Sequence, residues 1–316
     1  MENFELAIPG TITEAISLLP EQWDDSGGRS STLLAGGQDL LTVLKEGLMQ
    51  PERLVHLRGI KGLNGIEVAP DGSIRLGAMV KISALAESGA VQAAAPALAE
   101  AALSVGSPQI RNQGTLGGNL CQRPRCWYFR NSDAPCLKKG GLECFAYGGK
   151  NKYNAILGGG PSYIVHPSDL APVLVMMGAV LVCHSPRGER RIDLADFYTS
   201  PADGDVTREN VLEADEIISM VEVPQSPEGM STVYMKAQER GSFDFALSAV
   251  ALGLRVKAGV ITECRLVLGS VAPTPWRCSA AEGFAVGRDN DEAAWAEIAE
   301  IALADAEPLS ENGYKV

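Results

Sequence analysis

Four cysteines lie close together in the middle of the chain, at Cys121, Cys126, Cys136 and Cys144. Thiolates are the ligands of iron–sulfur clusters and of structural zinc, and these cysteines meet the ligand count of either centre. Structural zinc sites more often pair cysteines two residues apart, whereas this sequence contains no Cys-x-x-Cys. The irregular spacing therefore favours a [4Fe-4S] cluster, with zinc or unligated buried thiols as the alternatives. The other cysteines, Cys183, Cys264 and Cys278, are interpreted as core residues.

Two glycine-rich segments are the second candidate for chemistry. The first runs Ala35-Gly36-Gly37-Gln38-Asp39-Leu40, and the second runs Thr115-Leu116-Gly117-Gly118-Asn119. Glycine permits positive φ and close approach, and the free N–H groups of such a turn form a concavity that suits a phosphate. Two turns from separate subdomains could hold the diphosphate of a dinucleotide such as FAD, while structural turns are the alternative. Neither segment matches Gly-x-Gly-x-x-Gly or a P-loop, which disfavours a Rossmann or P-loop site.

Acid–base chemistry has little support in the sequence. His166 and Asp169 could form a pair, but the chain has only three histidines. Asp169 is better interpreted as an acceptor from a ribose hydroxyl. No Gly-x-Ser-x-Gly or His-Glu-x-x-His motif occurs, so hydrolysis is not expected.

Composition limits the partners that such a chain can have. Of the 316 residues, 46% are hydrophobic and 21% are charged, and the net charge is −12 without any basic block. Nucleic acid and anionic membranes would both require a positive surface, which leaves small molecules and proteins as partners. The apolar run 170–182 is too short to span a bilayer, and the acidic N-terminus does not resemble a signal peptide. We therefore expect a cytoplasmic protein, exported only together with a partner.

The elements that must position these residues are predicted from periodicity. Strands are expected at 4–8, 32–35 and 53–57, and Thr11 to Glu14 has the spacing of a helix-capping box. Hairpins are expected at 66–76 and 180–192, followed by strands at 217–223, 233–237, 246–256 and 260–268. Helices are expected at 93–105 and 293–306. Strands joined mainly by hairpins, with the helices grouped, predict an α+β fold.

Three motifs resemble those of a known family. Ala35 to Leu40, Ile110 to Asn119 and His166-Pro167-Ser168-Asp169-Leu170 are similar to the flavin motifs of the FAD-binding medium subunit of molybdenum hydroxylases. This group includes xanthine dehydrogenase, aldehyde oxidoreductase and carbon monoxide dehydrogenase. The resemblance implies a two-part FAD-binding domain of the molybdopterin-dehydrogenase type, at 1–57 and 58–177, and a smaller α+β domain with an antiparallel sheet at 178–316.

The resemblance also implies which residues contact FAD. Its diphosphate would lie on the two glycine-rich segments. The implied contacts are Leu33, Leu34, Ala35, Gly36, Gly37, Gln38, Asp39, Leu40, Val105, Ile110, Thr115, Gly117, Gly118, Asn119, Ser168, Asp169, Ile218 and Lys236. No catalytic residue is expected on this chain, because it would transfer electrons through FAD.

A cysteine-rich insert at 120–165 departs from the usual family pattern. Most members run almost directly from Gly-Gly-Asn to the Ser-Asp pair, whereas here the 48 residues from Leu120 to Pro167 intervene. The insert resembles one in 4-hydroxybenzoyl-CoA reductase and certain bacterial aldehyde oxidoreductases, where it holds an extra [4Fe-4S] cluster. Some of these relatives have a cysteine at the position of Ser162, so Cys121, Cys126, Cys136 and Cys144 form the complete set here.

The function implied by the resemblance is that of an electron-transfer subunit in a heterotrimer. A large subunit would hold the molybdenum cofactor, a small subunit would hold two [2Fe-2S] clusters, and the heterotrimers could dimerise. FAD would exchange electrons with NAD, a quinone, ferredoxin or another external partner. The alternatives are a stand-alone FAD oxidoreductase of the same fold and a zinc-stapled, non-catalytic scaffold subunit.

Overall fold

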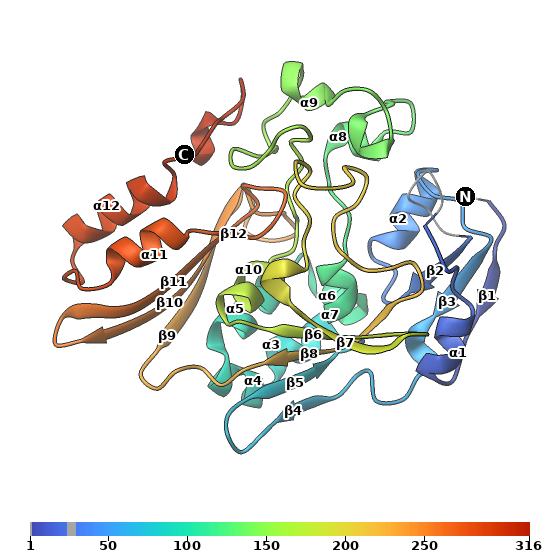
Figure 1. Cartoon of the computed structure of the whole chain (residues 1–316), viewed down its shortest axis with the longest axis horizontal. Helices are drawn as coiled ribbons and strands as arrows, with labels where there is room; N and C mark the ends of the chain where they lie inside the picture. Colours follow the sequence, from blue (N-terminus) through green and yellow to red (C-terminus); the bar gives the residue numbers. More distant parts are fainter. Residues whose placement is uncertain (1, 24–29) are drawn as a thin grey trace.

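The computed structural model describes residues 2–23 and 30–316, which form three sheets with helices packed against them (Figure 1). The first sheet is parallel, in the order β1 (Glu5–Ala7), β3 (Arg53–His56) and β2 (Ser31–Leu34). Helices α1 (Ile12–Ser17) and α2 (Leu40–Lys45) connect its strands. The predicted cap is present, because Thr11 Oγ1 accepts a hydrogen bond of 3.1 Å from the Glu14 amide.

The second sheet is antiparallel and has the order β4-β5-β8-β6-β7. Its strands are β4 (Ile66–Val68), β5 (Ile74–Gly77), β6 (Val180–Ser185), β7 (Gly188–Asp193) and β8 (Ile217–Val223). Helices pack against this sheet and against the C-terminal sheet, and together they form the largest apolar core of the described residues. The helices of this core are α3 (Ile82–Glu87), α4 (Gly89–Ala94), α5 (Pro96–Ser104), α7 (Leu116–Leu120) and α10 (Leu170–Met176). Helix α6 (Pro108–Gln113) has no buried residue and packs against α3.

Two expectations are corrected in this part of the fold. The helix predicted at 93–105 is divided at Ala95, because Pro96 lacks an N–H and disfavours helical backbone in the residue before it. The boundary predicted after residue 177 falls inside one structural unit, because β6 and β8 join the sheet that β5 begins. We propose the domain division between β8 and the next strand, in the segment 224–230.

The C-terminal part is a four-stranded antiparallel sheet with two helices on one face. The strands, in the order β12-β11-β10-β9, are β9 (Ser231–Ala237), β10 (Ser248–Lys257), β11 (Val260–Gly269) and β12 (Trp276–Arg277). The helices α11 (Ser279–Ala285) and α12 (Glu292–Ala302) cover a second apolar core. The antiparallel C-terminal sheet confirms the fold class.

The cysteine-rich insert contains only short helices, α8 (Trp127–Arg130) and α9 (Phe145–Gly148), and it lies over the other end of the molecule from β4 (Figure 1). The C-terminal tail packs against it. Asn151 and Glu311 exchange hydrogen bonds of 3.0 and 2.8 Å, and Asn312 Nδ2 donates to the carbonyls of Asn154 and Ala155. The tail therefore joins the insert to the C-terminal domain. Among the described residues, no helix is both long and apolar enough to cross a membrane.

Candidate cofactor-binding site

The two glycine-rich segments meet in the structure. Gly36 lies so close to the end of α6 that a Cβ atom there would be 2.1 Å from the Gln113 carbonyl oxygen and 3.0 Å from Gly114 Cα. A Cβ on Gly118 would be 3.7 Å from the Cβ of Ala35. Only glycine at position 36 permits this approach, because any larger residue would collide with backbone.

The first turn offers free backbone donors. The amides of Gly36, Gly37, Gln38 and Asp39 donate no hydrogen bond to any described residue. Gly37 has a φ of +73°, which bends the chain between β2 and α2 so that the turn is tight. Unpaired amides in such a turn are a fit for phosphate oxygens.

The second turn uses most of its amides within the protein. Its amides are already used, because Leu116 N–H donates to Val80 O at 2.9 Å and Gly117 N–H to Ala78 O at 2.8 Å. Gly118 N–H lies 3.3 Å from Thr115 Oγ1. This segment packs against the first turn and offers fewer open amides than it does. Its contact with a diphosphate stays a prediction.

A cavity of about 480 Å³ opens beside the two turns. That volume is in the range of cofactor and ligand pockets. Many of the residues predicted to contact FAD line it: Leu33, Ala35, Gly36, Gly37, Gln38, Asp39, Leu40, Val105, Ile110, Thr115, Gly118, Asn119 and Asp169. The predicted residues that do not line it are Leu34, Gly117, Ser168, Ile218 and Lys236.

These other residues support the cavity wall or the core. Leu34 and Ile218 are buried, and Gly117 packs on Ala78. Ser168 Oγ donates to Asn119 Oδ1 at 2.5 Å and accepts from the Ala171 amide at 3.0 Å. Ser168 thus orients a cavity-lining amide and caps the start of α10 at the same time.

Asp169 is fully engaged by the C-terminal sheet. Tyr234 Oη donates to its Oδ1 at 2.7 Å, and Lys236 Nζ lies 3.0 Å from its Oδ2. Burial raises the pKa of Asp169, although Lys236 and Tyr234 act against that rise. Both carboxylate oxygens therefore already have donors from β9. To accept the predicted hydrogen bond from a ribose hydroxyl, an oxygen of Asp169 would have to keep Tyr234 or Lys236 as a second donor. Lys236 also donates to the carbonyls of Ser104 and of Asp244, a residue that lines the cavity.

His166 does not act as the acid–base partner of Asp169. The imidazole is 4% exposed and stacks on Tyr198 with ring centroids 4.4 Å apart, and its Nε2 has no partner among the described residues. Burial lowers the pKa of His166 to about 4, so the ring is neutral near neutral pH. The histidine is therefore a buried, neutral residue that does not line the cavity.

The start of the insert forms a third wall that the sequence did not predict. Asp39 Oδ1 lies 2.7 Å from Arg130 Nη2 and 3.0 Å from Arg125 Nη2, and Asp39 Oδ2 accepts from the Arg123 amide at 2.7 Å. Asp39 therefore directs its carboxylate at the insert. The only sign of this contact in the sequence was the presence of three arginines near the cysteines.

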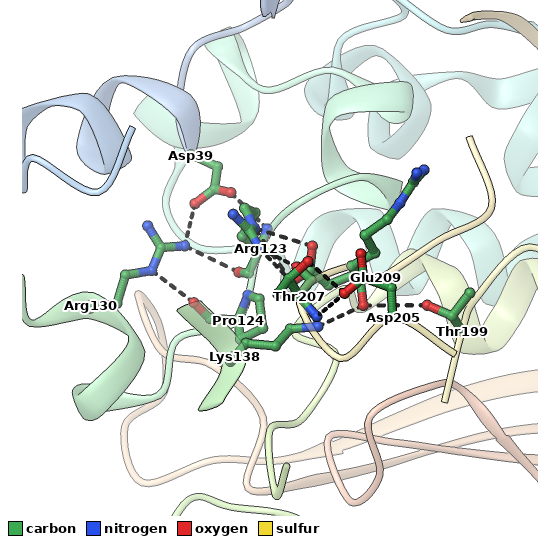
Figure 2. Close-up of polar contacts among 10 residues, drawn as sticks. Asp39, Arg123, Pro124, Arg130, Lys138, Thr199, Asp205, Thr207 and Glu209 are labelled. Atoms are coloured by element: carbon green, nitrogen blue, oxygen red, sulfur yellow. Dashed lines mark hydrogen bonds and ion pairs between the residues drawn. The ribbon is translucent and has the colours of Figure 1, made fainter. Parts of the chain in front are cut away.

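The connection between β7 and β8 contributes a second cluster of polar contacts, which joins it to the insert beside the cavity (Figure 2). Arg123 donates to Glu209 at 3.1 Å and to the Thr207 carbonyl at 2.7 Å, and Lys138 Nζ lies 3.1 Å from Glu209. Burial acts to raise the pKa of Glu209, but Arg123 and Lys138 hold it below the ordinary value. The cavity-lining segment 207–210 contains no motif that could have revealed this role.

The four predicted cluster ligands are not gathered. Cys121 lies at the cavity, near Cys183 and Tyr198; burial raises the pKa of both of these groups, and Cys121 adds to the rise. Burial likewise raises the pKa of Cys136, with a smaller contribution from the nearby Cys126, whereas Cys144 lies near Tyr163. Within residues 2–23 and 30–316, no group of three or more His, Cys, Asp or Glu side chains could hold a metal ion. The donor set as folded does not fit a four-thiolate cluster.

Comparison with known proteins identifies the family. Residues 2–226 match the FAD binding domain in molybdopterin dehydrogenase, and residues 232–315 match the CO dehydrogenase flavoprotein C-terminal domain. The chain therefore belongs to the family of FAD-binding medium subunits of molybdenum hydroxylases, which are subunits of oxidoreductases.

Individual relatives cover nearly the whole chain. It is 36% identical over 286 residues to the aldehyde oxidoreductase FAD-binding subunit PaoB of Escherichia coli, covering 90% of this chain and 86% of that protein. It is 30% identical to the carbon monoxide dehydrogenase medium chain of Hydrogenophaga pseudoflava, covering 98% and 89%. Reconstituted CO dehydrogenase from Oligotropha carboxidovorans has a chain with a TM-score of 0.77 and 25% identity, covering 99% of this chain and 92% of that one.

Proposed function

We propose that this chain is the FAD-carrying electron-transfer subunit of a heterotrimeric molybdenum hydroxylase. The observation that supports this most directly is the turn 36–39, whose free amides face a cavity walled by two subdomains and the insert. Bound FAD supplies the conversion between two-electron and one-electron transfer. The described residues bind and orient it: the first turn meets the diphosphate, the second turn holds the first in place, and β9 fixes Asp169.

The proposed partners are a large subunit with the molybdenum cofactor and a small subunit with two [2Fe-2S] clusters. Two carbon monoxide dehydrogenase relatives are medium chains, which supports a multi-subunit assembly. Electrons would pass between the small subunit and an external acceptor or donor, such as NAD, a quinone or ferredoxin. A dimer of heterotrimers in the cytoplasm is the proposed form.

The proposed [4Fe-4S] cluster in the insert rests on the number and density of its cysteines. The geometry of the described residues gives it no support, so no step of the proposed electron transfer passes through it. Chemical analysis decides this point.

One preparation tests the three functions that the sequence left open. The full chain, purified with its partners under anaerobic conditions, is assayed for FAD, iron, acid-labile sulfide and zinc. Stoichiometric FAD and no substrate turnover by the isolated chain are expected for the electron-transfer subunit. Turnover by the isolated chain with an external acceptor would favour the stand-alone oxidoreductase. Zinc without flavin would favour the scaffold. Iron and sulfide in excess of the partner clusters would show the insert cluster.

A further inference from the structure

The proposed diphosphate site needs positive charge, and the first turn provides only amide dipoles. Among the described residues, the arginines that line the cavity are Arg123, Arg125 and Arg208. Two of them are committed elsewhere. The Arg123 guanidinium donates to Glu209 and the Thr207 carbonyl, and that of Arg208 lies 4.2 Å from the Trp23 ring centroid and donates to the Leu212 carbonyl.

Arg125 is positioned next to the turn. Its Nη2 lies 3.0 Å from Oδ1 of Asp39, the last residue of the turn, and 3.3 Å from Gln122 Oε1. Its Cζ lies 5.0 Å from the ring centroid of Phe245, which comes from the loop after β9. The guanidinium is therefore held between the first turn and the C-terminal domain, on the cavity wall.

Asp39 and Glu46 offset the charges of Arg125 and Arg130, but the hydrogen-bond donors of Arg125 are incompletely used. Asp39 is shared with Arg130, which lies closer at 2.7 Å. Nε of Arg125 is buried without a partner, and no described residue hydrogen-bonds to Nη1. Burial lowers the pKa of Arg125, with Asp39 acting against that shift. A half-buried guanidinium whose Nη1 has no partner among the described residues is stabilised by an anion, and phosphate oxygens match its geometry.

We propose that Arg125 of the insert is a cofactor-binding residue whose open guanidinium donor hydrogen-bonds to the diphosphate of the flavin dinucleotide. This inference rests on the proposed function, because it takes the cavity to be the FAD site. It gives the insert a role in binding the flavin that does not depend on any metal. Arg130 and the main chain of Arg123 then act as positioning groups, since they fix Asp39.

The test compares FAD binding by the full chain after removal and readdition of the cofactor. The variants are Arg125→Gln, Arg125→Lys, Arg208→Gln and the control Arg75→Gln, whose side chain is 55% exposed on β5. Loss of one charge-assisted hydrogen bond should weaken FAD binding by Arg125→Gln by about 10- to 100-fold at low ionic strength. The difference in FAD affinity between wild type and Arg125→Gln should narrow at high ionic strength, because salt screens the attraction. Arg125→Lys should recover part of the lost affinity.

Three results would overturn the assignment. Equal FAD affinity for wild type and Arg125→Gln would show that Arg125 does not bind the cofactor. A loss that is independent of ionic strength, with a matching fall in the melting temperature of the FAD-free chain, would show a structural role only. A larger effect for Arg208→Gln would move the contact to the segment 207–212. If the wild-type chain itself binds no FAD, the proposed function fails instead.

Discussion

Arg123 hydrogen-bonds to Glu209 although the two residues come from different parts of the fold, the insert and the connection between β7 and β8. The Nε–Oε2 and Nη2–Oε1 distances are both 3.1 Å. The Arg123 amide also holds Asp39 at 2.7 Å. One residue thus joins two walls of the proposed cofactor cavity (Figure 2).

Replacing Arg123 by alanine should destabilise the chain. Glu209 would remain buried with Lys138 as its remaining charged partner, which should lower the free energy of unfolding by about 2–3 kcal/mol. Urea unfolding of wild type and Arg123→Ala measures this change in the free energy of unfolding. Arg75→Ala removes an exposed ion pair, 3.7 Å from Glu222, and should change the free energy of unfolding by less than about 1 kcal/mol. Equal losses in the two variants would contradict the role assigned to Arg123.

Gly36→Ala should separate the two glycine turns. The added Cβ would lie 2.1 Å from the Gln113 carbonyl, so the backbone must move at a cost of about 1–3 kcal/mol. We expect both a lower melting temperature and weaker FAD binding, measured by flavin fluorescence. Gly65→Ala is the matched control, because no atom lies within 4 Å of its added Cβ. Unchanged FAD binding by Gly36→Ala would argue against a diphosphate at this turn.

His166 should make stability depend on pH between about 4 and 6.5. Burial lowers its pKa from 6.5 to about 4, so in this window the unfolded chain binds a proton that the folded chain does not. Stability attributable to this group is present above pH 6.5 and is lost as the pH falls towards 4, by about 3 kcal/mol in total. Denaturant unfolding of wild type and His166→Gln at pH 7.5 and 5 measures the difference. Parallel pH profiles would show that His166 does not contribute.

Asn151→Ala should release the C-terminal tail from the insert. The Asn151 side chain donates to the carbonyls of Ala146 and Gly149 and to Ser310 Oγ, and accepts from the Glu311 amide at 2.8 Å. Loss of these hydrogen bonds should lower the free energy of unfolding by about 2 kcal/mol and speed amide hydrogen exchange in residues 309–315. Asn131→Ala, in an exposed turn of the same insert, should leave this exchange unchanged. Slow exchange in both variants would show that other contacts hold the tail.

Local features of the chain were predictable, and long-range pairings were not. The capping box at Thr11, the turn at Gly36 and the hairpins are encoded by neighbouring residues, and the structure has them. The pairing of β5 with β8 joins residues far apart in sequence, which is why the boundary after residue 177 was wrong. The contact of Arg123 with Glu209 is equally non-local. Cysteine spacing supplied a ligand count, but it contains no information on where each thiol points.

The hydrogen bond between Asn119 and Ser168 places the two ends of the insert side by side. The chain thus leaves the cavity at Asn119 and returns beside it at Ser168, so the insert forms a loop whose two ends are adjacent. A shorter connection could span these ends without disturbing α7 or α10, which makes the point permissive for gain or loss of a module during evolution. A chain shortened in this way would keep its backbone route but would need new cationic partners for Asp39.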